Sequence, residues 1–383
     1  MRTAGIICEY NPFHPGHRFH LMETRRRLGP DAGILCLMSG NYVQRGEPAI
    51  FDKWSRAKTA VENGADLVLE LPITVAINAA GYFADGAVAC LDALGCVDDL
   101  CFGSECGDLP QLQRTAELLC TPKFETALRQ QLETGVSYAR AREWALRSLG
   151  GNGQCLTTAN NALGVDYLRS LLLRGSTIRP MTVQRDLTQS TASDLRLMLS
   201  SGWRSHGETF SWMLDRPMHT MEYGERAILA TLKNLGRKQF EQMPFGSEGL
   251  WSKVMKACQK EMCIHEIILA CKSKRYTYSR LRRMLLCLFL GLSETDLHRP
   301  VPYLRALAFN DKGRQLLRNI AETGKLPIVS GAVPNFPDSK AYFALESRAT
   351  DLYGLFVQPG VVEPSGREKA TPPAYVRSED SSS

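Results

Sequence analysis

Two histidines that lie three positions apart, His14 and His17, flank a glycine in this chain of 383 residues. Imidazole N–H groups can donate hydrogen bonds to phosphoryl oxygens as negative charge develops in a transition state. Gly16, between them, lets the backbone approach a ligand closely. A pair of histidines is more often structural or metal-binding, so the interpretation depends on the elements that surround the pair.

Those elements favour a nucleotide site. Residues 4–9 are a short apolar run typical of a buried strand, and a helical pattern follows over 17–28. Ligands of α/β proteins bind outside the carboxyl ends of the strands. A helix N-terminus adds free N–H groups and a positive dipole end, which suit phosphate. Because both histidines fall at this strand-to-helix turn, we predict phosphate binding there.

Strands and helices alternate through the first 200 residues. Further buried strands are expected at 33–38, 67–71, 99–102 and 178–183. Helices are expected at 52–63, 76–94, 109–120, 124–131, 136–149, 160–174 and from about 193. This alternation predicts an α/β fold with a parallel sheet and right-handed crossovers.

Helical patterns dominate the second half of the chain. They cover 222–235, 249–259, 277–291, 294–297 and 311–323. The end of the chain carries Pro, Ser, Glu and Lys with little apolar content, which is typical of disorder. We therefore expect an α/β domain over 1–200, a mainly α-helical domain over 201–360 and a disordered tail over 361–383.

Composition places the chain among globular proteins, with 44% hydrophobic and 22% charged residues. No stretch of 18 or more uncharged apolar residues occurs, and the N-terminus lacks the features of a signal peptide, so we expect no membrane span and a cytoplasmic location. Twelve cysteines include no Cys-x-x-Cys pair. We interpret them as small buried residues in a reducing compartment and predict no metal site.

The net charge of +6 is unevenly distributed. Residues 1–200 hold 20 Lys and Arg against 21 Asp and Glu, whereas residues 201–383 hold 26 against 19. A basic excess confined to one half suggests a polyanionic partner, although a merely soluble basic domain is an equal alternative on charge alone. The basic residues that we expect to contact RNA phosphates are Lys272, Lys274, Arg275, Arg280, Arg282 and Arg283. We expect the last three to face solvent on the first turn of an apolar helix.

The segment from His14 to His17 resembles the His-x-Gly-His signature of a nucleotidyltransferase superfamily. Over nearly everything up to about residue 358, the chain also resembles the bacterial tRNA(Met) cytidine acetate ligase family. The segments that carry this resemblance are 5–17, 38–49, 64–72, 102–105, 160–164 and 302–310. The resemblance implies a Rossmann-like nucleotidyltransferase domain that activates acetate with ATP, with Mg²⁺ as the expected counter-ion, and acetylates elongator tRNA(Met).

The resemblance also implies which residues contact ATP. They are Ile7, Cys8, Glu9, Tyr10, Asn11, Pro12, Phe13, His14, Pro15, Gly16, His17, Arg18, Phe19, His20, Gly103, Asn160, Asn161, Arg185 and Ser193. Either Asn160 or Asn161 would bind the nucleotide, and Asn161 is slightly favoured. Ser193 and Arg196 fit a second phosphate motif, Ser-x-x-Arg at a helix start, for which a simple helix cap is the alternative. His14, His17 and Arg196 are the expected catalytic residues.

Polar residues after the second strand lie at the same predicted sheet edge as His14. Asn41, Gln44 and Arg45 are candidates to bind acetate or a phosphate. Lys53 could do the same, but a solvated helix end is an equal alternative for it.

The chemistry expected from these groups has two steps. Acetate would attack the α-phosphorus of ATP, and the resulting acetyl-adenylate would react with the N4 amine of the wobble cytidine. Two alternatives stay open at this point: a small-molecule adenylyltransferase, and a nucleotide-dependent RNA-binding protein without turnover. The first does not explain a basic helical second half, and intact His14, His17 and Arg196 speak against the second.

Overall fold

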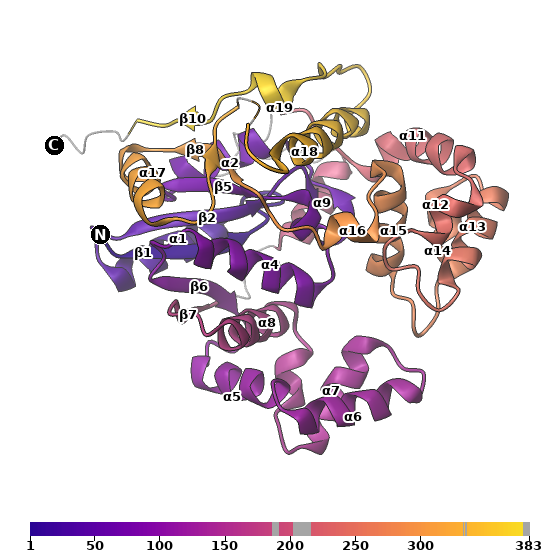
Figure 1. Ribbon diagram of the computed structural model, residues 1–383, viewed down its shortest axis with the longest axis horizontal. Helices are drawn as coiled ribbons and strands as arrows, with labels where there is room; N and C mark the ends of the chain where they lie inside the picture. Colours follow the sequence, from indigo (N-terminus) through magenta and orange to yellow (C-terminus); the bar gives the residue numbers. More distant parts are fainter. Residues whose placement is uncertain (186–190, 202–215, 332, 334, 378–383) are drawn as a thin grey trace.

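The computed structural model describes residues 1–185, 191–201, 216–331, 333 and 335–377. At its centre is an eight-stranded sheet with the strand order β10-β8-β5-β2-β1-β6-β7, and β9 pairs with β8 (Figure 1). The strands are β1 (Thr3–Cys8), β2 (Gly33–Ser39), β5 (Leu67–Leu71), β6 (Asp99–Ser104), β7 (Arg179–Gln184), β8 (Leu304–Phe309), β9 (Ile328–Val329) and β10 (Ala374–Tyr375). A separate hairpin pairs β3 (Tyr42–Val43) with β4 (Glu47–Pro48). All five strands predicted from the sequence are present.

The helices of the first part surround this sheet. They are α1 (Pro15–Leu28), α2 (Lys53–Glu62), α3 (Ile73–Ala76), α4 (Ala80–Ala93), α5 (Leu109–Leu119), α6 (Pro122–Glu133), α7 (Tyr138–Ser148), α8 (Ala159–Arg174) and α9 (Ala192–Ser200), with a 3-10 turn η1 (Gly153–Leu156). The predicted helix 76–94 corresponds to α4, which begins only at Ala80, and the preceding short helix α3 was not predicted. Asn78, between the two, donates to Thr74 O at 2.9 Å and to Leu297 O at 3.2 Å.

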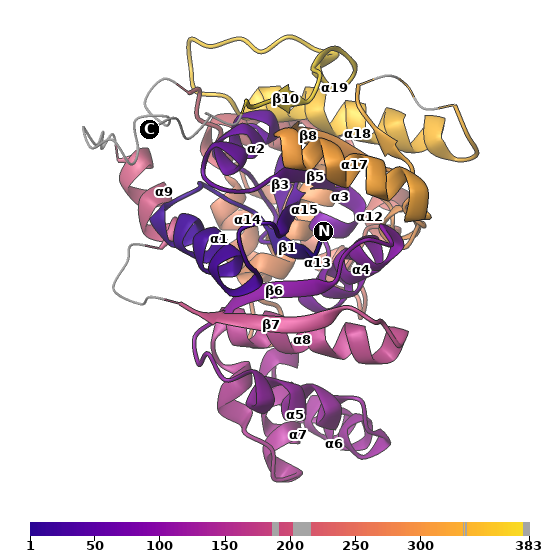
Figure 2. The same ribbon diagram turned by 90° about the vertical axis from the view of Figure 1, so that its left-hand side faces the viewer.

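Alternating side chains of β2 reach opposite faces of the sheet, and all seven of its residues are buried. Leu35 and Leu37 join a core with α4, α5, α8 and α17 (Asp311–Thr323), while Ile34 and Cys36 join a core with α1 and α2. Helices on both faces explain why this strand is a continuous apolar run. Helices α5, α6 and α7 form a lobe beyond α8 (Figure 2).

The helical region begins with α11 (Met221–Asn234) and has its own core. Its other helices are α12 (Arg237–Glu241), α13 (Leu250–Lys260), α14 (Ile264–Cys271), α15 (Tyr278–Leu290) and α16 (Glu294–Leu297). Ile228, Leu285 and Tyr353 belong to this core. Helices α12 and α14 were not predicted from the sequence.

The chain then returns to the sheet, contrary to the expected boundaries of the helical domain. β8 pairs with β5 in the antiparallel direction, so the sheet is largely but not wholly parallel. Strand β8 follows the helical region and is not joined to β5 by a single helical crossover. Antiparallel strands at the side of an otherwise parallel sheet are common. Helix α17 (Asp311–Thr323) follows as predicted, and α18 (Ser339–Tyr353) and the turn η3 (Gly354–Phe356) come after it.

The prediction of a disordered tail from residue 361 is wrong for residues 361–377. They contain α19 (Arg367–Ala370) and β10, which extends the sheet beside β8. Glu368 is fully buried, and its charge is tolerated there because the carboxylate pairs with two buried cations, Lys53 and Arg305. The other residues of 361–377 are half-buried or exposed, so a polar composition did not show that Glu368 attaches this segment to the sheet. Residues 378–383 lie outside the described residues.

Candidate nucleotide and phosphate site

His14 caps the N-terminus of α1. Its Nδ1 accepts a hydrogen bond from the backbone N–H of Gly16 at 3.1 Å. The side chain is buried, and burial, followed by the nearby charge of Arg185, lowers the pKa of His14 to about 4. The ring is therefore neutral at pH 7, and because Nδ1 accepts, the proton lies on Nε2. His14 thus presents one N–H donor.

His17 lies on the first turn of α1 and stacks on His14, with 3.7 Å between ring centroids. Burial, and then the neighbouring His14, hold its pKa well below the usual range. Its Nδ1 atom is buried and has no hydrogen-bond partner among the described residues. A buried polar atom without a partner is costly, so a ligand that supplies one would be favoured.

The other residues of the predicted ATP segment have different surroundings. The side chains of Ile7, Tyr10 and Phe13 are parts of the apolar cores, so they support the turn from within. Arg18 and Phe19 are exposed on α1. The remaining members are Cys8, Glu9, Asn11, Pro12, Pro15, Gly16 and His20.

Two of these residues connect to neighbouring segments. Asn11 Oδ1 accepts from the backbone N–H of Ile50 at 2.8 Å, which fixes the loop before the histidines. His20 Nε2 lies 3.4 Å from Cys101 Sγ on β6. The turn is therefore attached to the segment before α2 on one side of the histidine pair and to the sheet on the other.

The second predicted phosphate motif lies against the first. Arg196, on α9, donates to the backbone oxygen of Asn11 at 2.5 Å and to Ser193 Oγ at 3.1 Å. Arg45 donates to the same hydroxyl at 3.2 Å. A capping box formed by Thr191 and the residue three positions later orders the start of α9. Two helix N-termini and two guanidinium groups therefore meet around Asn11.

Gly103 and Arg185 lie together on the other side of the histidines. A Cβ atom at Gly103 would lie 3.4 Å from Cγ of Arg185, so the two residues are close. The backbone N–H of Arg185 donates to Ser104 O at 2.9 Å, which continues the pairing of β6 with β7. This places Arg185 near His14, as its effect on that pKa indicates.

Asn160 and Asn161 both bind the loop after β6. Asn161 is buried, and its Oδ1 accepts from the backbone N–H groups of Glu105 and Cys106 at 2.9 and 3.2 Å. Asn160 Nδ2 donates to the Glu105 carboxylate at 2.7 Å. Both side chains are already hydrogen-bonded to this loop, so they hold it in place beside the nucleotide site.

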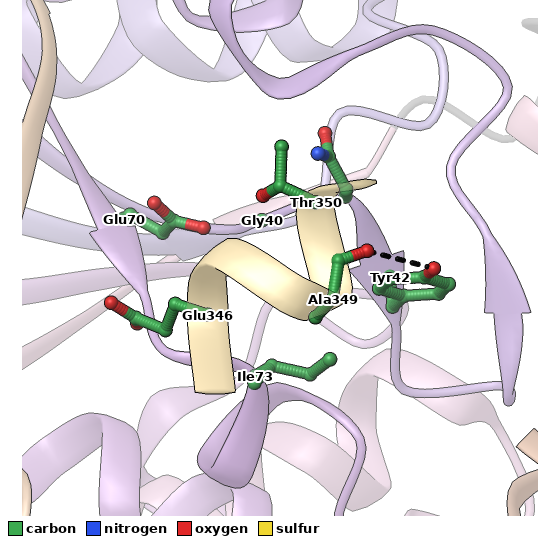
Figure 3. Close-up of a pocket in the computed structure, with 8 residues that line it drawn as sticks. Gly40, Tyr42, Glu70, Ile73, Glu346, Ala349 and Thr350 are labelled. Atoms are coloured by element: carbon green, nitrogen blue, oxygen red, sulfur yellow. Dashed lines mark hydrogen bonds between the residues drawn. The ribbon is translucent and has the colours of Figure 1, made fainter. Parts of the chain in front are cut away.

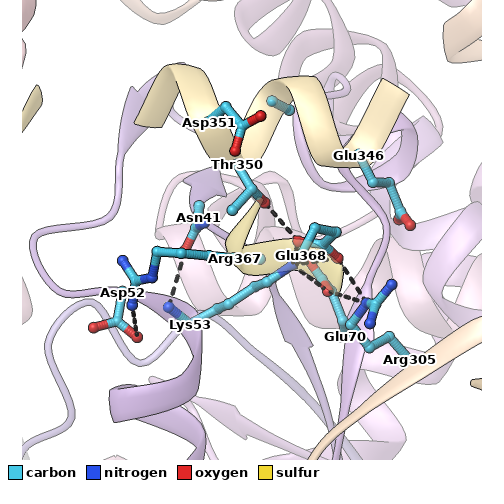
Figure 4. A network of polar contacts seen from close by, with 12 residues as sticks. Asn41, Asp52, Lys53, Glu70, Arg305, Glu346, Thr350, Asp351, Arg367 and Glu368 are labelled. Carbon is cyan, nitrogen blue, oxygen red and sulfur yellow. Dashed lines mark hydrogen bonds and ion pairs between the residues drawn. The ribbon is translucent and has the colours of Figure 1, made fainter. Parts of the chain in front are cut away.

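Lys53 is not the solvated helix end that was one alternative for it. Its side chain is 1% exposed, and its Nζ lies 2.7 Å from oxygens of both Glu70 and Glu368 (Figure 4). Burial lowers its pKa, but the two carboxylates outweigh burial and raise it. Because both carboxylates already occupy the ammonium group, the structure gives no support to Lys53 as a ligand of acetate or phosphate.

A small cavity lies beside this charge cluster (Figure 3). Its lining residues are Gly40, Asn41, Tyr42, Glu70, Ile73, Glu346, Ala349 and Thr350. The space open to the centre of a water molecule is about 10 Å³, close to the minimum for one water. Asn41 accepts from the backbone N–H of Lys53 at 2.9 Å, and its Nδ2 is buried without a partner among the described residues. The free amide thus borders a space suited to water.

Gln44 is held at the tip of the β3–β4 hairpin. Its backbone N–H donates to Glu9 Oε1 at 2.8 Å, and its Nε2 is buried without a partner in the described part of the chain. Burial raises the pKa of Glu9, an effect that the Gln44 N–H opposes. Gln44 and Arg45 therefore lie beside the phosphate motif with polar groups available to a small anion.

The predicted RNA-contacting residues divide into two groups. Lys272, Lys274 and Arg275 are exposed, and Arg275 pairs with Glu248 on the surface. Arg280, Arg282 and Arg283 were expected to face solvent, but each is half-buried. Their side chains contact neighbouring segments: Arg280 donates to Phe245 O, Arg282 pairs with Glu47, and Arg283 donates to Gln44 O.

Sequence reasoning missed several carboxylates of this region. Glu105 receives the N–H groups of Asn160 and Asn161, at 3.1 and 2.7 Å, and Glu47 pairs with arginines of two helices. Both belong to segments that carry the family resemblance, which is the signal that could have identified them. Glu346 and Glu368 lie in segments with no such signal.

Neither a metal cluster nor a membrane span is present in the described part of the chain. No group of three or more His, Cys, Asp or Glu side chains could hold a metal ion there. Within the same residues, no helix is long and apolar enough to cross a membrane.

The turn with its neutral histidines, at the carboxyl end of β1, defines a nucleotidyltransferase of the class that carries this signature. A family model described as HIGH Nucleotidyl Transferase matches residues 1–368. A protein of Acetivibrio thermocellus named tRNA(Met) cytidine acetate ligase is 33% identical, and the match covers 96% of this chain and 98% of that protein. One of the same name from Thermoanaerobacter sp. is 37% identical, with 93% and 95% covered. The chain belongs to the tRNA(Met) cytidine acetate ligase family.

Solved structures agree with this assignment. A crystal structure of Thermotoga maritima TmcAL bound with alpha-thio ATP superposes with a TM-score of 0.89 at 31% identity, covering 99% of this chain and 100% of that chain. The apo form of the same protein gives the same values. The predicted fold, an α/β domain with a largely parallel sheet followed by a helical region, is therefore confirmed.

Proposed function

We propose that this protein activates acetate with ATP as acetyl-adenylate and transfers the acetyl group to N4 of the wobble cytidine of elongator tRNA(Met). The single observation that carries this proposal is the meeting of two helix N-termini around Asn11. One brings His14 and His17, and the other brings Ser193 and Arg196. N–H donors, a hydroxyl and a guanidinium together suit a triphosphate.

In the first step, an acetate oxygen attacks the α-phosphorus, and the bond to pyrophosphate breaks. The Nε2–H of His14 and an N–H of His17 donate to the phosphoryl oxygens as their negative charge grows. Arg196 binds the leaving pyrophosphate. Because both histidines are neutral at pH 7, each offers one N–H donor to the phosphoryl oxygens.

In the second step, the cytidine amine attacks the acetyl carbon, AMP leaves, and the amine gives up one proton. The amine lies on a base that must leave its stack to reach this carbon.

Before the first step, acetate must be held beside the α-phosphorus. We assign Gln44 and Arg45 to the acetate carboxylate, because Gln44 Nε2 lacks a partner among the described residues and Arg45 supplies positive charge.

We expect Mg²⁺ to be the counter-ion of the ATP phosphates, where it would offset their negative charge. Glu9 and Glu47 are the carboxylates beside the phosphate motif, and each is already bound, to Gln44 N–H and to arginines respectively. The residues present therefore do not fit a protein-held magnesium cage, and Mg²⁺ would be carried by the substrate.

Pyrophosphate exchange tests the proposal. We expect ATP–pyrophosphate exchange that requires acetate and proceeds without tRNA. Exchange that depends instead on a cofactor precursor would indicate a small-molecule adenylyltransferase, and RNA binding without any exchange would indicate a non-catalytic protein. Mass analysis of tRNA(Met) nucleosides from cells that lack the protein tests the second step, because N4-acetylcytidine should disappear.

A further inference from the structure

The β3–β4 hairpin lies between the nucleotide site and helix α15. At its turn, Gly46 has a φ of +77°, and a Cβ there would lie 2.5 Å from the backbone nitrogen of Arg283. The turn thus lies directly against the backbone of α15. Arg283 also donates to the backbone oxygen of Gln44 at 3.1 Å. These contacts join the hairpin to the helical region.

The same hairpin contacts the phosphate motif. The N–H of Gln44 donates to Glu9, at the end of β1, and Arg45 donates to Ser193 on α9. One short hairpin therefore touches α15, α9 and the loop that carries the histidines.

Glu47, on β4, is shared between two arginines from different helices. Its Oε2 lies 2.5 Å from Arg282 Nη1 on α15, and its Oε1 lies 3.7 Å from Arg196 Nη2 on α9. The carboxylate is 15% exposed, so it depends on these cations more than a solvated group would. Arg282 is 26% exposed and Arg196 is 21% exposed, so an anion can reach either.

Competition for one carboxylate links the two arginines. When a phosphate takes Arg196, Glu47 keeps Arg282, and when an RNA phosphate takes Arg282, Glu47 keeps Arg196. When both are taken, Glu47 has neither partner and remains largely buried, which is unfavourable. The two binding events therefore oppose each other, and by linkage each weakens the other by the same factor.

We propose that Glu47 is a shared counter-ion through which phosphate binding at Arg196 and tRNA binding at Arg282 oppose each other. This inference rests on the proposed function, since it takes ATP and tRNA as the two ligands. It implies an order of events: the helical region binds tRNA most tightly after pyrophosphate has left Arg196. Glu47 is thus a positioning residue that acts through the two arginines.

The test measures tRNA(Met) affinity in three states of the nucleotide site. The protein is titrated with tRNA at fixed salt without nucleotide, with ATP but no acetate, and with AMP. We expect ATP to weaken tRNA binding by about fivefold or more, and AMP, which lacks the β- and γ-phosphates, to have little effect. Equal tRNA affinity with and without ATP would overturn the inference.

Two variants separate the shared carboxylate from simple repulsion between ATP and RNA. Repulsion persists in Glu47→Gln, whereas our inference requires the effect of ATP to disappear in it. Glu248→Gln, a matched loss of one carboxylate from a surface pair with Arg275, should keep the effect. An ATP effect of the same size in Glu47→Gln and in the unmodified protein contradicts the inference. Acetate-dependent exchange, measured separately, tests the proposed function on its own.

Discussion

The ammonium group of Lys53 lies 2.7 Å from the carboxylate of Glu368, 315 positions later in the chain. The two side chains are 1% and 0% exposed. Arg305 approaches the same carboxylate to 2.6 Å. One residue of the C-terminal segment therefore pairs with two cations, one from the first domain and one from β8, and it attaches this segment to the sheet.

We expect Glu368→Gln to destabilise the whole protein. The change leaves Lys53 and Arg305 with one fewer charge partner in a buried site, and breaking a buried pair in this way costs about 3–5 kcal/mol. Chemical unfolding, followed by circular dichroism, measures the loss. Glu241→Gln, which breaks an exposed pair with Arg237, is the control and should change the free energy of unfolding by less than about 1 kcal/mol. A similar small effect in both variants would show that the buried contact adds little.

The sequence predicted the five central strands because each is a short apolar run bounded by turn residues. It did not predict β8, because residues 304–309 follow helices and nothing local marks a return to the sheet. The tail was misjudged for a related reason. Composition shows that Glu368 is charged, but only the folded chain brings it to cations that are 315 and 63 positions away.

Local geometry at the candidate site follows from the sequence where the partners are close neighbours in the chain. His14 and Gly16 form a cap within one turn, so their spacing alone carries the geometry. Lys53 and Arg282 were misjudged because their partners, Glu70 and Glu47, lie on other elements. The sequence shows which side chains carry charge, whereas long-range packing decides which of them remain available to a ligand.

Removing either histidine should greatly slow adenylate formation. We expect His14→Ala and His17→Ala each to lower acetate-dependent pyrophosphate exchange by about 10²–10³-fold, the usual effect of losing a transition-state donor. His14→Ala also removes a helix cap, which costs about 1 kcal/mol. His14→Ser can restore the cap without restoring the donor. If His14→Ser restores the exchange activity that His14→Ala loses, the activity depends on the helix cap and not on the Nε2–H donor.

Stability should depend on the protonation of Glu346. Burial, and then the charges of Glu70 and Glu368, raise the pKa of Glu346 from 4.5 to about 8. The folded state therefore holds one proton more than the unfolded state between these pH values. The free energy of unfolding should fall as pH rises through this window, by on the order of 5 kcal/mol. Below about pH 4.5 this contribution is fully present.

Glu346→Gln provides the comparison for this pH dependence. Glutamine mimics the protonated carboxyl and does not titrate, so urea unfolding at pH 5, 6.5 and 8 should give a flatter profile in the variant. The Tyr303 hydroxyl, 2.6 Å from Glu346, can still donate to the amide oxygen. Parallel profiles for the two proteins would show that Glu346 titrates alike in the folded and unfolded states.

Charge reversal at the exposed lysines should separate the two steps of the reaction. Lys272 and Lys274 lie on the surface of the helical region, and neither takes part in the hairpin contacts of Arg282 and Arg283. We expect Lys272→Glu with Lys274→Glu to weaken binding of every tRNA tested. The slope of log affinity against log salt should also become shallower, by about one for each phosphate that the variant no longer neutralises. Acetate-dependent exchange without tRNA should not change.

Two further variants show whether the effect of the double lysine variant is specific to this surface. Lys58→Glu reverses an exposed lysine of α2 and should leave tRNA affinity unaltered. Arg283→Glu should instead alter both tRNA affinity and exchange, because Arg283 holds the hairpin through the backbone oxygen of Gln44. If the double lysine variant binds tRNA like the unmodified protein, Lys272 and Lys274 lie outside the RNA surface.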